Sequence, residues 1–337
     1  MSLLPYLTRV VNREDLAAAD AEAAMETILA GRATDAQIAA FLIALKMKGE
    51  TSPELVGFAR AMRRMAARVE PGIEGQALLD TCGTGGDGRE TFNISTVAAF
   101  VVAGAGVHVA KHGNRSISSK CGSADLLEAW GIDIAAPPER AARAIREIGI
   151  GFLFAPAVHS AMKHAQPVRT QLKMRTAFNL LGPLTNPSGA NAQLAGAPSE
   201  DSARLIAGAL AELGLERGFV VYGHDGLDEI TTTTTTTAWE IGRGKAEKRI
   251  LEPADFAVRT AKPEDLRGGG PARNVEIAEA VLGGAPGPQR DIVLANSAAA
   301  LVAAGRVATF LEGAALAAVS IDTGAARRKV AELARFR

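Results

Sequence analysis

The chain has 337 residues, of which 47% are apolar and only 4% aromatic, so it is long enough for two lobes and apolar enough to be globular. Its 37 basic and 37 acidic residues cancel, which excludes a global attraction to nucleic acid or to an acidic membrane. Any anion site must therefore be local. The longest apolar stretches, such as residues 97–107, are too short to cross a bilayer.

The sequence shows no targeting signal and no metal-finger pattern. The N-terminus lacks a basic segment followed by a long apolar core, so we expect no secretory signal. Two cysteines, Cys82 and Cys121, are too few for a disulfide framework, and the sequence leaves a single bridge between them open. No CxxC or Cys/His ligand spacing occurs. These features predict a cytoplasmic protein that does not enter a membrane.

Residues 1–71 are predicted to be helical. Thr34 and Thr51 are each followed three residues later by Gln or Glu, which fits the capping box that begins a helix. Apolar residues at helical spacing follow both sites. A Pro-Gly pair at 71–72 then ends this section.

From residue 77 the pattern changes to short apolar strands that alternate with helices. The expected strands cover residues 77–80, 107–110, 151–154, 193–197 and 218–222. The expected helices between them cover residues 123–130, 138–148 and 201–213. Such alternation predicts an α/β fold with a mostly parallel central sheet.

The strand pattern lapses between about residues 160 and 187, where residues 168–175 are typical of a helix. We therefore expect a small all-helical domain formed by residues 1–71 with 162–187. A larger α/β domain would comprise residues 72–161 with 188–337. Further on, seven threonines at 231–237 favour a solvated edge strand, because β-branching restricts χ1.

Three segments between residues 80 and 115 carry groups suited to phosphate. The first, DTCGTGGDG at 80–88, has glycines that let bare N–H groups approach an anion. The second, NIST at 93–96, precedes an apolar run, so a helix N-terminus would add its positive dipole end. The third, KHGNR at 111–115, supplies mobile positive charge from Lys111 and Arg115. Three such segments in series predict a ligand with more than one phosphate.

Two common nucleotide motifs do not fit the first segment. Its glycine spacing matches the dinucleotide fingerprint, but that motif needs an acidic residue about 20 residues on, and the next strand ends in Lys111 instead. A P-loop needs Lys-Ser/Thr after its last glycine, whereas Arg89 follows Gly88. Isolated glycines would only make tight turns, so the phosphate interpretation depends on the three segments together.

Three further features are ambiguous on their own. Asp228 and Glu229 follow a predicted strand, where a carboxylate pair suits Mg²⁺, although two solvated surface acids are the commoner case. Arg169, on its predicted helix, could grip a carboxylate through two parallel hydrogen bonds, although a solvated helix face is again commoner. His112 lies inside the third segment and is a candidate ligand contact.

Taken together, the motifs resemble one family closely over nearly the whole chain: anthranilate phosphoribosyltransferase, of tryptophan biosynthesis. The segments that carry the resemblance are DTCGTGGDG at 80–88, FNIST at 92–96, KHGNRSISS at 111–119, GSADLL at 122–127, RTAFNLLGPLTNP at 175–187, GLDEI at 226–230 and RDIVLANSAAA at 290–300. The resemblance implies a helical domain joined to an α/β domain, usually as a homodimer. It also implies transfer of the phosphoribosyl group of phosphoribosyl pyrophosphate (PRPP) to the amine of anthranilate, with release of diphosphate.

The resemblance also implies the roles of single residues. Two Mg²⁺ ions per monomer would be held by Ser95, Asp228 and Glu229, and anthranilate would contact Gly83, Asn114 and Arg169. No residue is expected to act as a general acid or base, because the amine already carries its lone pair. The implied PRPP contacts are Gly83, Gly86, Asp87, Thr91, Asn93, Ile94, Ser95, Thr96, Lys111, His112, Gly113, Asn114, Arg115, Ser116, Ile117, Ser118, Ser119 and Ser123.

Two departures and two alternatives accompany this interpretation. Many relatives have Gly-Pro where this chain has Thr at 234–235, and some have a tyrosine at Val158. A pyrimidine nucleoside phosphorylase of the same fold would carry Lys-His-Ser at 81–83, where this chain has Thr-Cys-Gly. A non-catalytic nucleic-acid-binding relative should show a basic groove and eroded motifs. The zero net charge and intact motifs argue against it, so we expect no nucleic-acid partner.

Overall fold

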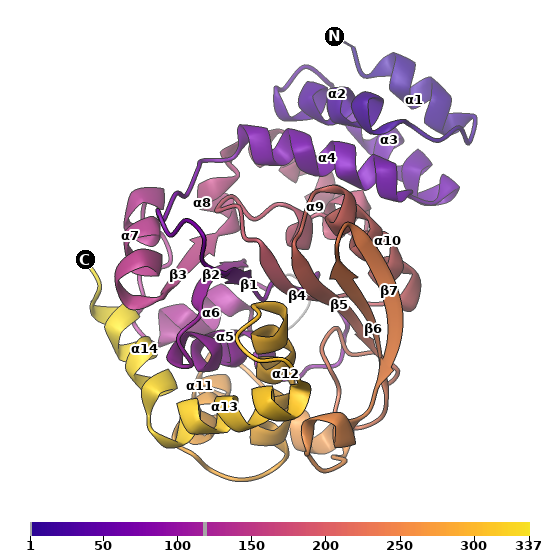
Figure 1. Cartoon of the computed structure of the whole chain (residues 1–337). Coiled ribbons are helices and arrows are strands. Elements are labelled where there is room, and N and C mark those ends of the chain that lie inside the picture. Colours follow the sequence, from indigo (N-terminus) through magenta and orange to yellow (C-terminus); the bar gives the residue numbers. More distant parts are fainter. Residues whose placement is uncertain (1, 117–119) are drawn as a thin grey trace.

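The molecule consists of a group of four helices above a seven-stranded sheet that further helices cover (Figure 1). The computed structural model describes residues 2–116 and 120–337. The predicted contacts Ile117, Ser118 and Ser119 lie outside this part of the chain. The first four helices are α1 (Leu4–Val11), α2 (Ala18–Leu29), α3 (Asp35–Lys48) and α4 (Ser52–Met65). The small helical section predicted at the N-terminus is therefore confirmed.

Capping residues begin two of these helices as the sequence indicates. The Gln37 N–H donates to the Thr34 hydroxyl (3.3 Å), and the Thr34 N–H donates to the Gln37 side chain (3.1 Å), so this capping box is complete. At the next helix the Thr51 N–H donates to Glu54 (2.9 Å), but among the described residues the Thr51 hydroxyl has no partner. Only half of the second box forms.

The sheet has the strand order β3-β2-β1-β4-β5-β6-β7. The first five strands run parallel, and the last two are antiparallel to their neighbours, which confirms a mostly parallel sheet. Each of the five predicted strands is present within a few residues of its expected bounds. The strands are β1 (Leu78–Asp80), β2 (His108–Gly113), β3 (Ile150–Phe154), β4 (Ala192–Gly196), β5 (Arg217–Gly223), β6 (Thr236–Gly242) and β7 (Lys245–Leu251).

Alternating side chains of the central strands enter two different cores. Leu194 and Phe219 pack with one set of helices, whereas the next residues, Ala195 and Val220, pack with α10 (Glu200–Glu212) and the N-terminal helices. The first face is covered mainly by α5 (Ile94–Gly104), α11 (Pro271–Leu282), α12 (Pro288–Ala303), α13 (Phe310–Asp322) and α14 (Ala325–Arg335). The helices α6 (Ser123–Ala129) and α7 (Pro138–Ile148) complete the α/β part.

The segment between β3 and β4 consists of short helices that pack on the N-terminal group. They are α8 (Ala155–Val158), α9 (Gln166–Leu172) and three 3₁₀ turns at Ser160–His164, Ala177–Asn179 and Gly182–Leu184. Val168 and Phe178 are buried in the same cluster as Phe41 and Phe58. The predicted helix 168–175 is wrong at its end, because Lys173 takes a left-handed conformation (φ 49°) and stops α9 at Leu172.

The threonine run does not form a solvated edge strand. β6 begins only at Thr236 and lies between β5 and β7, so it is an interior strand. The Asp225 carboxylate accepts hydrogen bonds from the hydroxyls of Thr231 and Thr233 and holds the first half of the run in a turn. Side-chain capture by a carboxylate therefore overrides the β-propensity of these residues.

Candidate active site

The predicted phosphate segment and the predicted metal ligands meet at the carboxyl ends of the parallel strands. β1 leads into the glycine loop (residues 81–88), and β5 leads into the acidic loop (residues 224–230). The Gly85 N–H donates to an Asp228 carboxylate oxygen (2.8 Å), although the two residues are 143 positions apart. The Ser95 N–H donates to Glu229 (3.1 Å). This edge is where open α/β sheets bind ligands.

The two loops approach so closely that side chains between them are excluded. A Cβ atom on Gly196, the last residue of β4, would lie 1.5 Å from the Asp228 carbonyl oxygen. A Cβ on Gly83 would lie 3.3 Å from the Asp228 carboxylate. Gly196 also accepts a hydrogen bond from the Thr84 N–H (2.9 Å). Gly196 therefore fixes the distance between the loops, a role that no local motif revealed.

The acidic pair has few partners for its charge. Burial raises the pKa of Asp228, and the nearby Asp87 raises it further. Burial likewise raises the pKa of Glu229, and Asp228 adds to that shift. Within residues 2–116 and 120–337, none of these three acids forms an ion pair. Hard oxygen donors crowded in this way fit Mg²⁺, which would relieve their mutual repulsion.

Ser95 takes its predicted place beside the acids. It lies in the first turn of α5, which begins at Ile94 and so confirms the helix start expected after the NIST segment. Both the N–H and the hydroxyl of Ser95 face Glu229. The N–H groups of Ile94 and Thr96 donate to the carbonyls of Phe92 (2.7 Å) and Asn93 (3.1 Å), so what this end of α5 adds for an anion is its positive dipole.

Lys111 is not the mobile cation that the sequence analysis expected. It lies within β2, and only 4% of it is exposed. Its ammonium donates to the carbonyl (3.0 Å) and the hydroxyl (3.1 Å) of Thr81, directly under the glycine loop. Its charge favours ionised Asp80 and Glu229, yet burial still raises the pKa of Asp80 to about 6. Lys111 is thus an internal counter-charge that supports the loop from below.

His112 is buried beside a second histidine. Its ring Nδ1 lies 3.2 Å from the Gly182 carbonyl oxygen, and its ring centroid lies 5.2 Å from that of His159. Burial lowers the pKa of His112 to about 3 and that of His159 to about 4. The Nε2 atoms of both are buried without a partner among the described residues. Both rings are therefore neutral at neutral pH, each with a single N–H.

Asp80, Cys82 and His112 bring possible metal-ligand atoms within 4.8 Å of one another, all buried. Burial raises the pKa of the Cys82 thiol, and the Asp80 charge raises it further, so the sulfur stays protonated. The trio also supplies three ligand atoms, fewer than the four of a structural zinc site. Cys82 and Cys121 are not joined by a disulfide, so the bridge that the sequence left open does not form.

The third segment continues into a turn whose charges are already paired. The Arg115 guanidinium contacts Asp125 (2.9 Å) and Glu128 (2.9 Å), so it is not a free cation in this structure. The Asn114 N–H donates to the hydroxyl of Ser123 (3.2 Å). A Cβ on Gly113 would lie 2.3 Å from that same hydroxyl. The predicted contacts Gly113, Asn114 and Ser123 are therefore brought together, with Ser116 beside Asp125 (3.2 Å).

The remaining predicted contacts lie around the start of α5. Asn93 is the N-cap residue, with Thr96 in the first turn, and Thr91 forms an isolated bridge with Arg267. The Asn93 amide donates to the Cys121 carbonyl (3.0 Å) and accepts from Asn274 (2.8 Å). Asn274, on α11, was not predicted. It orients Asn93 from a distance of 181 positions.

Arg169 lies on α9, on the helical side of the site. Its guanidinium carbon lies 5.2 Å from the centroid of the Phe178 ring, and Nη1 contacts Gln166 at 3.5 Å. Burial lowers the pKa of Arg169, although the group stays cationic at any ordinary pH. A flat, partly desolvated guanidinium on an aromatic face suits an aromatic carboxylate.

Two supporting residues escaped the sequence analysis. Asn296, fully buried on α12, accepts from the Ile230 N–H (3.0 Å) and donates to the Ile230 carbonyl (2.9 Å). It thereby fixes the chain directly after Glu229. Arg175 donates to the carbonyls of Gly85 (3.0 Å) and Gly86 (2.9 Å) in the glycine loop. Both lie in quoted motifs, but sequence spacing does not show which backbone groups they hold.

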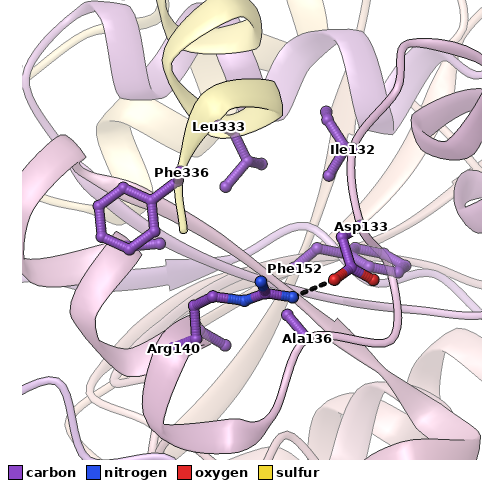
Figure 2. Close-up of a pocket in the computed structure, with 9 residues that line it drawn as sticks. Ile132, Asp133, Ala136, Arg140, Phe152, Leu333 and Phe336 are labelled. Atoms are coloured by element: carbon purple, nitrogen blue, oxygen red, sulfur yellow. Dashed lines mark hydrogen bonds and ion pairs between the residues drawn. The ribbon is translucent and has the colours of Figure 1, made fainter.

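A separate small cavity lies between α7 and the end of α14 (Figure 2). It has a volume of about 20 Å³ and is lined by Ile132, Phe152, Leu333 and Phe336, with an ion pair between Asp133 and Arg140 at its mouth. Such a volume holds little more than one water molecule, so this cavity is not a ligand site. In the described part of the chain, no helix has the length and apolar character that a membrane span requires.

Two family matches divide the chain. Residues 4–66 match the helical bundle domain of the glycosyl transferase family, and residues 75–327 match its a/b domain. The fold and the site therefore define a glycosyltransferase built from these two parts.

Named relatives narrow this class. The chain is 73% identical to anthranilate phosphoribosyltransferase of Solibacter usitatus over 336 residues, which covers 100% of this chain and 99% of that protein. It matches the crystal structure of the Thermus thermophilus enzyme with a TM-score of 0.92 and 42% identity over 98% of both chains. The yeast enzyme in complex with PRPP and Mg matches with a TM-score of 0.89 and 29% identity, over 98% of this chain and 96% of that one. The chain belongs to the anthranilate phosphoribosyltransferase family. This membership favours phosphoribosyl transfer to anthranilate over the nucleoside phosphorylase activity that the sequence left as an alternative.

Proposed function

We propose that the protein transfers the 5-phosphoribosyl group of PRPP to the amine of anthranilate, giving N-(5-phosphoribosyl)anthranilate and diphosphate. The observation that carries this proposal is where the acidic loop lies: Asp228 accepts from the Gly85 N–H of the glycine loop, and Glu229 accepts from the Ser95 N–H at the start of α5. Phosphate donors and metal-binding acids therefore lie at one place. A magnesium diphosphate ligand needs both.

The residues that would hold magnesium are Ser95, Asp228 and Glu229, with two ions per monomer. All three offer oxygen, and burial together with neighbouring acids raises the pKa of both carboxyl groups, a repulsion that a bound cation would relieve. The yeast relative was solved with PRPP and Mg, which supports magnesium in this chain. When bound, the metal would neutralise charge on the departing diphosphate.

The chain's own residues bind and orient the two substrates. N–H groups of the glycine loop would hold the phosphates where negative charge develops, and the N-terminus of α5 would add its positive dipole end, which is electrostatic stabilisation of the transition state. Arg169 would grip the anthranilate carboxylate, with Gly83 and Asn114 beside the ring. The yeast relative in complex with 4-fluoroanthranilate supports an aromatic acid as ligand.

Proton transfer needs no dedicated catalyst in this scheme. The aromatic amine presents its lone pair directly, so it needs positioning more than deprotonation. His112 is neutral and buried, and its Nδ1 is taken by the Gly182 carbonyl. We therefore assign no general acid or base.

We place the domain boundaries at residues 1–71 with 162–187 for the helical domain, and at 72–161 with 188–337 for the α/β domain. We also propose a homodimer through the helical domain. Leu4, Val11 and Met47 are 50%, 61% and 71% exposed on α1 and α3, an apolar surface that a second copy would cover. A cytoplasmic location suits two cysteines that form no disulfide.

The decisive experiment is a fluorescence assay of anthranilate consumption by the purified protein with PRPP. Consumption should depend on PRPP and stop when Mg²⁺ is removed with a chelator. Phosphorolysis of thymidine without anthranilate turnover would instead establish the nucleoside phosphorylase. Tight DNA binding without turnover would establish a nucleic-acid-binding protein.

A further inference from the structure

One arginine outside the predicted contact set holds the glycine loop from its carbonyl side. Arg175 lies 90 positions from Gly85 in sequence, yet its Nη1 donates to the carbonyls of both Gly85 (3.0 Å) and Gly86 (2.9 Å). Its other terminal nitrogen, Nη2, is buried and has no partner among the described residues. A half-buried guanidinium is therefore committed to the backbone of one loop rather than to an acid.

The same glycine connects this arginine to the acidic loop. The Gly85 carbonyl accepts from Arg175, while the Gly85 N–H donates to Asp228 (2.8 Å). Gly85 and Gly86 both have positive φ (65° and 76°). Glycine adopts this conformation at little cost but is not locked in it, so the conformation alone does not hold the loop in one position. Because the backbone is soft here, the position of the Gly85 amide depends on the groups that hold its two sides.

Arg175 is itself held on a firm base. The next residue, Thr176, donates its N–H to the Asn179 side chain (2.9 Å), and Ala177 and Phe178 are buried in the core shared with the N-terminal helices. The guanidinium thus reaches the glycine loop from the helical side of the molecule. It does so from the same segment that carries Arg169 but points to a different partner.

We propose that Arg175 is a positioning residue for PRPP. Its two hydrogen bonds hold the glycine loop where the Gly85 N–H meets Asp228 and where the other N–H groups of the loop face the diphosphate. This inference rests on the proposed function. It assigns Arg175 to the PRPP side, although its segment otherwise belongs with the anthranilate contact Arg169. Loss of the guanidinium should therefore weaken PRPP and spare anthranilate.

The test compares Arg175→Ala and Arg175→Lys with the wild-type enzyme and with Lys163→Ala, which removes an exposed charge from the same segment. Calorimetry with PRPP and Mg²⁺, without anthranilate, measures affinity apart from turnover. Arg175→Ala should bind PRPP about 10- to 100-fold more weakly, since two charge-assisted hydrogen bonds are lost. Arg175→Lys should lie between it and the wild type, because lysine lacks the planar fork. Lys163→Ala should match the wild type.

Steady-state kinetics and melting temperature distinguish positioning from mere stability. The KM for PRPP should rise in parallel with the calorimetric loss, while the KM for anthranilate and the melting temperature stay at wild-type values. Millimolar guanidinium should restore part of the PRPP affinity of Arg175→Ala, and methylammonium should not. Unchanged PRPP affinity, or equal losses for both substrates with a lower melting temperature, would overturn the inference. A wild-type enzyme without turnover would instead refute the proposed function.

Discussion

Two groups of buried carboxylates in this molecule differ in how completely their charges are paired. Glu54, fully buried on α4, accepts from the N–H groups of Leu16 (3.0 Å) and Thr51 (2.9 Å) and from the Lys48 ammonium (3.1 Å). Asp228 and Glu229 each accept one backbone N–H and have acids as neighbours. The first arrangement is complete in the folded chain. In the second, neither acid forms an ion pair with another described residue.

The difference teaches how to separate a stabilising acid from a functional one. A buried charge that is fully paired costs the fold little free energy. Removing one partner leaves the other charge uncompensated in the low-dielectric interior, which destabilises the fold strongly. Acids whose pKa values are raised by burial and by each other destabilise the fold when ionised, and such shifts cluster at functional sites. Glu54 should therefore matter for stability, and the acidic pair should matter for activity.

The largest effect is expected for Asp228→Asn. Turnover should fall by about three orders of magnitude, because a metal ligand and the acceptor of the Gly85 N–H change together. The melting temperature should stay level or rise, since one of two repelling charges is gone. Enzyme kinetics and calorimetry measure the two effects, and Asp201→Asn on exposed α10 is the matched control. A large loss of stability in Asp228→Asn would break the comparison.

Glu54→Gln should show the opposite pattern. We expect the free energy of unfolding to fall by about 3 kcal/mol, because Lys48 loses a buried counter-charge and keeps only Asp15. Turnover measured well below the melting temperature should remain at the wild-type level. Urea denaturation gives the first value and the anthranilate assay the second. Lost activity in a variant of normal stability would place Glu54 among the functional acids.

A buried histidine without a charged partner should make the stability of the fold depend on pH. The pKa of His159 is lowered to about 4 by burial, so its neutral form stabilises the fold above pH 6.5. That stability is lost as the pH falls from 6.5 toward 4, amounting to about 2 kcal/mol at pH 5. Urea denaturation of His159→Gln should therefore show a flatter decline between pH 7 and 5. An unchanged slope would mean that other groups cause the acid sensitivity.

The smallest expected effect is the stabilisation of the fold by Mg²⁺, which compares the two groups of acids directly. Mg²⁺ alone, at ten times its dissociation constant, should stabilise the wild type by about 1.4 kcal/mol. The increment should persist in Glu54→Gln and vanish in Asp228→Asn. Thermal melts with and without the ion measure it. Equal stabilisation of all three proteins would show that magnesium binds elsewhere.

The local sequence pattern predicted the helices, strands and loops of the site, but not the distant residues that hold them in place. The start of α5 at Ile94 followed from the NIST segment, because a cap and an apolar run are near one another in sequence. The burial of Lys111 did not follow, since alternation cannot show that Thr81 lies above its ammonium. Arg175, Asn274 and Asn296 were missed for the same reason. Each holds a backbone or amide group far away in sequence, and spacing contains no record of such partners.

The threonine run shows a second limit. Its β-propensity is real, and Thr236 and Thr237 do lie in β6. Asp225 nevertheless captures the hydroxyls of Thr231 and Thr233, and the Thr231 N–H donates to the Thr236 hydroxyl (3.0 Å). A single carboxylate thus divides seven identical residues into a turn and a strand. No scale of intrinsic preference can divide a homopolymer.

Strand order also fixes when a newly made chain can become an enzyme. β1, which leads into the glycine loop, sits in the middle of the sheet and pairs with β4, whose residues leave the ribosome roughly 110 positions later. Synthesis of that stretch takes on the order of 10 s. Throughout this interval the nascent chain has the glycine loop but neither Gly196 nor the acidic pair. A polypeptide that stalls before residue 228 therefore lacks the acidic side of the site, whatever part of the sheet it has formed.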